Sequence, residues 1–179
     1  MHRKTGYGLV AVACCALGVA MASAKEPVAG VNKIAFPESF ANGVMYTTVD
    51  RADNKQYREL FSTPEAIDAV KSGKPIPSGA VLTLVQYKAR LDPQGNPEKG
   101  ANGRFIKGDL IGYTVMEKRN GWGADYGDDI RNGEWEYQAF TATKQVNEKA
   151  NLKNCFACHK PLDKQDYVFS FEAMKTAKR

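Results

Sequence analysis

The pentapeptide Cys155-Phe156-Ala157-Cys158-His159, near the C-terminus, constrains the folding of this chain more than any other stretch. Two cysteines separated by two residues and followed at once by a histidine are the attachment pattern of a c-type haem, in which each thiol adds to a vinyl group and the imidazole binds the iron. The chain must therefore build its core around this cofactor. We expect one covalently attached haem c, held by Cys155 and Cys158, with His159 as the iron ligand.

A structural zinc site, a redox dithiol and a plain disulfide are the alternatives for the same motif. Without the N-terminal leader described below, Cys155 and Cys158 are the only cysteines and His159 is the only histidine. Zinc would then need a carboxylate as its fourth ligand, which is uncommon in closed structural sites. A thioredoxin-like dithiol should follow a strand in a βαβ unit. These requirements favour haem.

The first 24 residues have the pattern of a secretory signal peptide. A short basic stretch precedes an apolar run over residues 7–21, and Ala22-Ser23-Ala24 supplies a small-residue cleavage site, so the mature chain should begin at Lys25. The run is too short and too rich in alanine and glycine for a membrane span; an uncleaved anchor and a lipoprotein attached through Cys14 are the alternatives. Because c-type haem is attached outside the cytoplasmic membrane, we expect the protein in the periplasm.

The mature chain, residues 25–179, has the length of a single domain with one core. It keeps 23 basic and 20 acidic residues, a net charge of +3, because Arg3 and Lys4 leave with the leader. The charges are scattered, with no basic stripe rich in aromatic residues, so we expect no nucleic-acid binding. The mild positive charge is compatible with docking to an acidic redox partner protein.

Alternation of apolar and polar residues predicts a mostly β domain. The segment 80–89 is apolar on both faces in its first half, which places it in the middle of the sheet. Because turns and not long helices separate the strands, the sheet should be antiparallel. The predicted strands are residues 44–49, 57–61, 80–89, 109–118 and 134–140, with another extended segment beginning at 104–107. Ile111, Tyr113 and Val115 should share one face of their strand, and Trp135, Tyr137 and Ala139 should lie opposite Glu134, Glu136 and Gln138.

Helices should pack on this sheet. Ser62-Thr63-Pro64-Glu65 begins one that ends at Gly73. Residues 144–159 have helical character, with the haem motif at their end, and 171–178 form a terminal helix after a short extended piece at 166–169. The predicted fold class is α+β, with a curved antiparallel sheet, a few packed helices and a C-terminal haem site.

The order of these features resembles the cytochrome P-460 family, which includes the cytochromes c′-beta. The resemblance is carried by Cys155-Phe156-Ala157-Cys158-His159 together with the stretches 78–82, 103–105, 108–112, 132–137, Phe140 and 166–169. It implies one haem held against a curved sheet and a homodimer. Members of the enzymatic branch oxidise hydroxylamine and bond a lysine to the porphyrin. Members of the c′-beta branch lack that bond and bind nitric oxide or carbon monoxide in an apolar pocket.

Two positions decide between the branches. The resemblance places Leu84 where the cross-linking lysine lies, and leucine cannot form that bond. It places Thr114 where hydroxylamine-oxidising members keep a glutamate. Lys88, on the same face of the strand, would restore the enzymatic reading only in a shifted register.

The sequence also offers candidates for the sixth iron ligand and for contacts with the haem. The sixth ligand is Met45, Met116, Met174, a lysine or no side chain, and an open site is the leading hypothesis. Arg58 is a candidate for a haem propionate, with a solvated surface arginine as the alternative. Phe61, Phe105, Trp135, Tyr167 and Phe169 are candidates for packing near the haem, with ordinary core packing as the alternative.

Two functions follow. The first is a haem protein that binds a small diatomic ligand or carries electrons. The second is an oxidoreductase acting on hydroxylamine or a related small nitrogen compound.

Overall fold

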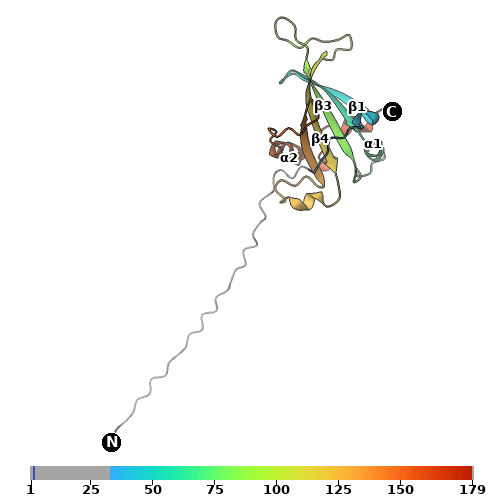
Figure 1. Cartoon of the computed structure of the whole chain (residues 1–179). Helices are drawn as coiled ribbons and strands as arrows, with labels where there is room; N and C mark the ends of the chain where they lie inside the picture. The colour runs from blue at the N-terminus through green and yellow to red at the C-terminus, as the bar shows by residue number, and fades with distance from the viewer. Residues whose placement is uncertain (1, 3–32, 179) are drawn as a thin grey trace.

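The computed structural model describes residue 2 and residues 33–178, which form an open five-stranded sheet with helices (Figure 1). Every pair of consecutive strands is antiparallel, in the order β1-β2-β3-β4-β5, so the predicted α+β fold and antiparallel sheet are confirmed. The segment predicted for the middle of the sheet is the central strand. The strands are β1 (Val44–Arg51), β2 (Gln56–Ser62), β3 (Val81–Ala89), β4 (Lys107–Lys118) and β5 (Trp135–Thr141).

The helices are short. Helix α1 (Pro64–Lys71) begins with proline in its first turn, as predicted, and α2 (Lys153–His159) carries the cysteines and the histidine of the haem motif. Helix α3 (Phe171–Lys175) packs against α1. The remaining helical segments are the 3₁₀ turns η1 (Phe40–Asn42), η2 (Trp122–Asp125) and η3 (Lys160–Gln165).

Several local predictions are wrong. Residues 144–152 form turns, because the Asn147 and Asn151 side chains accept backbone N–H groups two residues on and compete with helix. Val146 bridges Phe140 at the edge of the sheet. Residues 166–169 form a left-handed turn and not an extended piece, and the terminal helix ends at Lys175. The leader and the start of the mature chain, residues 1–32, lie outside the described residues except for residue 2.

The strand faces also differ from expectation at two places. A bulge in the pairing of β3 with β4 leaves Ile111 exposed, so it does not share a face with the buried Tyr113 and Val115. Gly112 lets β5 approach there, since a Cβ atom would lie 2.4 Å from the Phe140 carbonyl oxygen. Both faces of β5 are buried, including Glu136 and Gln138.

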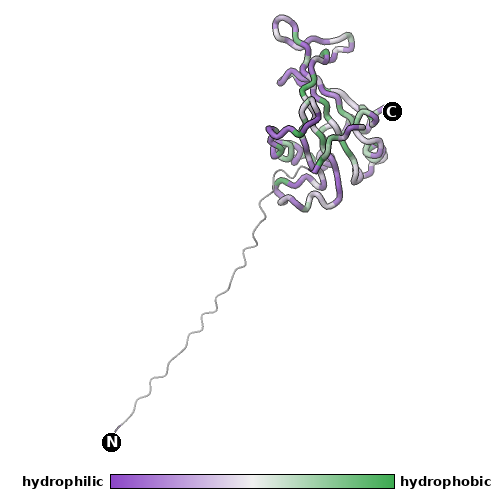
Figure 2. Tube along the Cα trace, in the orientation of Figure 1, coloured by the Kyte–Doolittle hydropathy of each residue, from purple (hydrophilic) through white to green (hydrophobic). Residues whose placement is uncertain are grey.

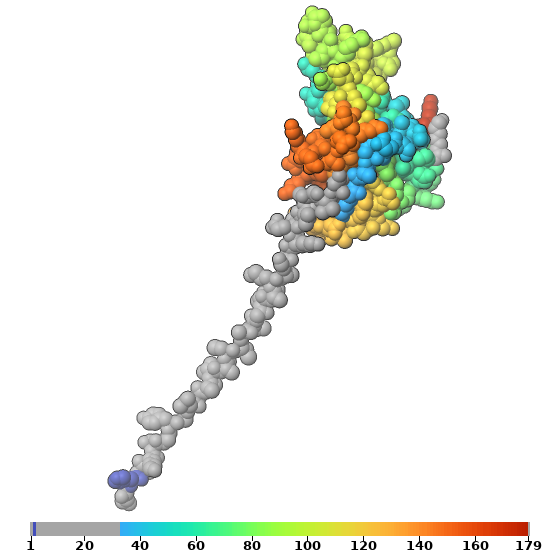
Figure 3. Space-filling model, in the orientation of Figure 1, coloured from blue at the N-terminus to red at the C-terminus, as the bar shows by residue number. Residues whose placement is uncertain are grey.

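The sheet separates two cores. One face carries α1, α2 and α3 and a core that includes Ile67, Leu82, Trp135 and Met174. Residues 33–42 cover the other face, where Ile34, Phe36 and Phe40 pack on Tyr113 and Phe140. Figure 3 shows the blue segment that contains residues 33–42 lying beside the orange segment near residue 145. The Lys144 ammonium donates a hydrogen bond to the Glu38 carboxylate between these two segments.

Apolar colour follows the strands in Figure 2, whereas the loop that leaves the end of β3 is mostly polar. This loop, predicted over residues 92–103, projects beyond the sheet in Figure 1 as an arm with the bridges Leu91 to Pro97 and Lys99 to Phe105. No helix among the described residues is long and apolar enough to cross a membrane.

Candidate haem-binding site

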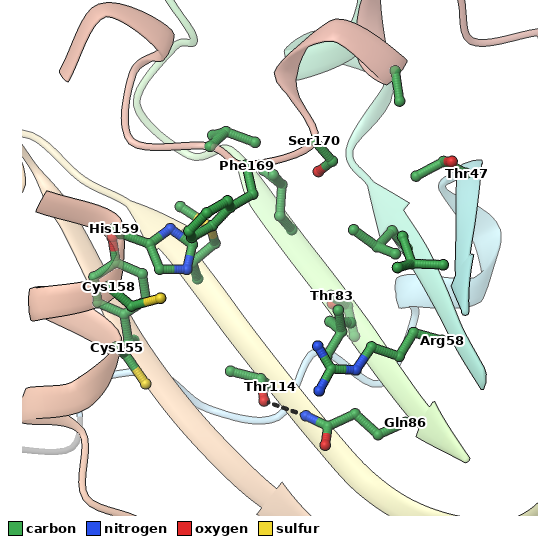
Figure 4. A pocket seen from close by; sticks show the side chains of 18 of the residues that line it. Thr47, Arg58, Thr83, Gln86, Thr114, Cys155, Cys158, His159, Phe169 and Ser170 are labelled. Carbon is green, nitrogen blue, oxygen red and sulfur yellow. Dashed lines mark hydrogen bonds between the residues drawn. The ribbon is translucent and has the colours of Figure 1, made fainter. Parts of the chain in front are cut away.

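A cavity of about 680 Å³ lies between the sheet, α2 and the segment that leads into α3 (Figure 4). This volume falls within the usual range for small-molecule and cofactor sites, and carbon atoms dominate its walls. The haem motif lines one side and the sheet lines the other. The lining includes Thr47, Val49, Arg51, Arg58, Leu60, Leu82, Leu84, Gln86, Thr114, Met116, Tyr137, Cys155, Cys158, His159, Val168 and Phe169.

Cys155 and Cys158 present free thiols to the cavity from α2 (Figure 4). Cys155 is half-buried, and burial raises the pKa of its thiol, whereas Cys158 is exposed. The helix brings both thiols to the cavity that His159 also lines. This donor set fits the two thioether bonds and the single imidazole ligand of a c-type haem.

His159 is oriented by the backbone of the turn that follows it. Its Nδ1 atom lies 2.6 Å from the carbonyl oxygen of Tyr167, and because a carbonyl only accepts, we assign the proton to Nδ1. Nε2 then keeps its lone pair. Burial lowers the pKa of His159, which favours the neutral imidazole that metals bind.

Two aromatic rings hold the imidazole plane. The His159 ring lies 4.9 Å from the Tyr137 ring and 5.0 Å from the Phe169 ring, between centroids. Phe169 remains 59% exposed at the cavity mouth, where it is available to cover a bound group. Tyr167 acts through its carbonyl, and both residues were candidates for packing near the haem.

Sequence reasoning missed the residues that support this turn. Asp166 and Tyr167 have left-handed backbones, with φ of 49° and 61°. The Asp166 carboxylate accepts hydrogen bonds from Lys118 Nζ at 2.6 Å and Trp135 Nε1 at 3.1 Å, which ties the turn to the sheet. The stretches 132–137 and 166–169 carry the resemblance to the cytochrome P-460 family, and this resemblance was the sequence signal that could have pointed to these residues.

Asn132 supports α2 in the same way. It is 1% exposed, and its Nδ2 donates to the Tyr137 hydroxyl and to the Phe156 carbonyl oxygen, at 3.0 Å each. One buried amide therefore links the ring beside His159 to the helix that carries the cysteines. Asn132 begins the stretch 132–137 that carries the family resemblance, but the sequence gives no signal for the contacts of its side chain.

The sheet wall consists of side chains aligned across strands. Leu84 lies opposite Thr114 in register, and the Gln86 Nε2 donates to the Thr114 hydroxyl oxygen at 2.8 Å. The two positions that distinguish the family branches are therefore direct neighbours in the cavity. Three rows run across this wall from the arginine end toward His159: Val49, Arg58 and Gln86, then Thr47, Leu60, Leu84 and Thr114, then Leu82, Met116 and Tyr137.

Two arginines make one end of the cavity positive. Arg58 donates from Nε and Nη2 to Gln56 Oε1 at 2.9 and 2.7 Å, and burial followed by the nearby Arg51 lowers its pKa. Arg51 forms a bidentate pair with Asp53 at 2.8 and 2.6 Å. Both arginines line the cavity, so the residues suit an anionic substituent there.

Two of the three methionine candidates for the sixth iron ligand, and Lys88, lie outside the cavity lining. Met45 is 51% exposed and Met174 is fully buried, and neither lines the cavity, unlike Met116. Lys88 is an exposed residue outside the cavity lining, with its ammonium 3.9 Å from Asp109.

The aromatic candidates from the middle of the chain also lie outside the cavity lining. Phe61 packs in the core of the opposite face, Phe105 lies at the base of the projecting arm, and Trp135 is buried under the turn at Asp166. Within the described part of the chain, no group of three or more His, Cys, Asp or Glu side chains is arranged to hold a metal ion.

Comparison with protein families gives a match to the model described as Cytochrome P460 over residues 37–170. Comparison with curated protein sequences gives no significant match. The family match covers most of the chain and includes the strands, the haem motif and the turn after it. The fold, the donor set and this match agree, and the chain belongs to the cytochrome P460 family, as a c-type cytochrome with a haem cofactor.

Proposed function

We propose that the protein is an exported mono-haem c-type cytochrome whose iron keeps an open sixth site for nitric oxide or carbon monoxide. The observation that carries the proposal is the wall facing the haem motif. Its centre consists of Leu60, Leu84 and Thr114, which cannot bind iron as histidine, methionine or lysine side chains do.

The chain's own residues would divide the work as follows. Cys155 and Cys158 would hold the haem, His159 would bind the iron through Nε2, and Arg58 would neutralise a propionate. When bound, the haem supplies an iron atom that takes a diatomic ligand and changes redox state by one electron. Leucine at position 84 leaves no amine for a bond to the porphyrin, which supports ligand binding over hydroxylamine oxidation.

Met116 is the one methionine candidate that lines the cavity. It pairs across the sheet with Tyr137, whose ring packs on His159, so it lies at the imidazole end of the cavity. This position supports a core role for Met116 and not iron ligation. The leader pattern supports a periplasmic location, and the family resemblance supports a homodimer.

Resonance Raman and magnetic circular dichroism of the ferrous protein test the open site. We expect a five-coordinate high-spin iron that binds carbon monoxide without displacing a side chain, and the same spectrum in Met116→Ala. A six-coordinate low-spin spectrum that Met116→Ala converts to high spin would identify an electron carrier. Ferrous absorption at unusually long wavelength would indicate a cross-linked haem and favour hydroxylamine oxidation.

A further inference from the structure

We propose that Thr114, oriented by Gln86, is a hydrogen-bond donor that determines ligand specificity in the cavity. It would favour small ligands whose terminal atom accepts a hydrogen bond, such as an anionic nitrogen ligand, over carbon monoxide. This inference rests on the proposed open iron site and deepens it by naming the residue that discriminates between ligands.

Thr114 lies at the centre of the wall opposite the haem motif. It is on β4, directly across from Leu84, in the row that also contains Leu60 (Figure 4). Its neighbours in that row, Leu84 and Ala139, are apolar. A hydrogen bond made in such surroundings is stronger than one made in water.

The direction of the Thr114 proton follows from its partner. The amide nitrogen of Gln86 donates to Thr114 Oγ1 at 2.8 Å, so this bond uses a lone pair of the hydroxyl and leaves its proton free. Within the described residues, the hydroxyl donates to no protein acceptor. Its side chain faces the cavity, so a ligand there is the acceptor within reach.

Thr47 provides the contrast. It lies in the same row of the wall and lines the same cavity, but its hydroxyl donates to the backbone oxygen of Thr48, at 3.5 Å. Two threonines on one wall thus differ in whether their proton is already engaged. Of these two threonines, only Thr114 is expected to affect ligand preference.

Gln86 acts as a positioning residue. Its register partner on β2, Arg58, donates to Gln56, so the Gln86 amide remains directed at Thr114. Replacing the amide by a carboxylate, as in Gln86→Glu, would reverse the bond, because a carboxylate only accepts. The Thr114 proton would then point to the new carboxylate and away from the cavity.

Titration of the haem-loaded ferric protein with sodium azide tests the proposal. Because azide is anionic and accepts a hydrogen bond at its free end, Thr114→Val should weaken its affinity by about tenfold. Thr114→Ser should restore most of it, Gln86→Glu should weaken it again, and Thr47→Val should weaken it by less than about twofold, the change expected where no hydrogen bond is lost.

Carbon monoxide bound to the ferrous protein gives a second measurement. Its affinity should change far less than that of azide in Thr114→Val, while its infrared stretching band should move to higher wavenumber as the positive hydroxyl proton is lost. The absorption spectrum of each unligated variant checks that the haem site is intact.

Equal azide affinities in the wild type and Thr114→Val would overturn the proposal, and so would an equal loss in Thr47→Val. A wild-type protein that binds neither azide nor carbon monoxide would instead contradict the open iron site, and this inference with it.

Discussion

The two faces of the sheet are built from the same strands, yet one is closed and the other is hollow. On the closed face, Phe36 meets Phe40, Tyr113 and Phe140 edge to face, with ring centroids 4.9 to 6.0 Å apart. On the cavity face, Thr114 and Leu84 border an open space of about 680 Å³. Because neighbouring residues of a strand point to opposite faces, Val115 is buried in the closed face while Thr114, one residue away, lines the cavity.

What covers each face explains the difference. Residues 33–42 lie across the closed face and fill it with aromatic rings. On the other face, the helices fill only the end of the sheet that carries Leu82 and Met116, and the rows toward Arg58 stay open. Substitutions on the two faces should therefore have separable effects on haem and on stability.

Substitutions in the haem motif should have the largest effect, which is the loss of covalently bound haem. In the double variant with Cys155→Ser and Cys158→Ser, acid acetone should extract all of the haem, because no thioether bond remains. The wild type and the closed-face variant Phe140→Ala should keep their pigment with the protein. Haem leaving the wild type in acid acetone would contradict covalent attachment.

The closed face should dominate stability. Phe140 is 3% exposed, so Phe140→Ala should lower the free energy of unfolding by about 3–5 kcal/mol, measured by urea denaturation. Leu84→Ala removes a half-buried side chain beside the cavity and should cost less than about 2 kcal/mol.

The haem spectrum should respond in the opposite order. It should stay unchanged in Phe140→Ala and shift in Leu84→Ala, because only Leu84 lines the cavity. Equal losses of stability in both variants would show that the cavity face is packed as tightly as the closed face.

The turn that holds His159 should give an intermediate effect. Asp166→Asn keeps the size of the side chain and tolerates the left-handed backbone, but removes the charge that faces Lys118. We expect a loss of about 1–2 kcal/mol in stability, the range between an exposed and a buried ion pair.

Asp166→Asn should also weaken the hydrogen bond that orients the His159 imidazole. The iron–histidine stretching band should move to lower wavenumber, because the Tyr167 carbonyl that accepts from His159 is less well fixed. Lys175→Met, which removes an exposed partner of Glu172, is the matched control and should leave the band in place. An unchanged band in Asp166→Asn would show that Tyr167 is held without Asp166.

The sequence predicted the elements and residues that depend on local patterns. Alternation located β3 to β5, Pro64 located the start of α1, and the cysteine motif pointed to three residues that line one cavity. The turns at 144–152 were missed because two asparagine side chains, and not a run of residues, decide the backbone there.

The sheet wall of the site could not be predicted in the same way. Which side chains meet across strands depends on register, and the bulge at Ile111 shifts that register without a sequence signal. The bond between Gln86 and Thr114 and the one between Lys118 and Asp166 join residues 28 and 48 positions apart. Only the folded sheet brings them together.

The smallest predicted effect is a pH-dependent change in stability, caused by a buried carboxyl at the margin of the closed face. Glu136 is 4% exposed and accepts a hydrogen bond from the Tyr126 hydroxyl at 2.8 Å, with Lys33 Nζ 3.3 Å from its other oxygen. Burial raises the pKa of Glu136 despite both partners, while the pKa of Lys33 is raised because its two acidic neighbours outweigh burial. We expect the effect of burial on the Glu136 pKa to outweigh the opposite effects of Tyr126 and Lys33, because so little of the carboxyl is exposed to water.

The sign of the pH dependence follows from that direction. A carboxyl whose pKa is higher in the folded protein than in the unfolded chain, where it is 4.5, contributes stability that is complete below that unfolded value and is lost as pH rises through the folded value. Glu136→Gln removes this loss, so the variant should gain on the wild type above about pH 4.5, by roughly 1.4 kcal/mol for each unit of pKa shift. Tyr126→Phe removes a hydrogen bond that lowers the Glu136 pKa and should extend the loss to higher pH. Urea denaturation at a series of pH values measures both curves, and a Glu136→Gln curve parallel to that of the wild type would show that Lys33 and Tyr126 fully compensate the burial of the charge.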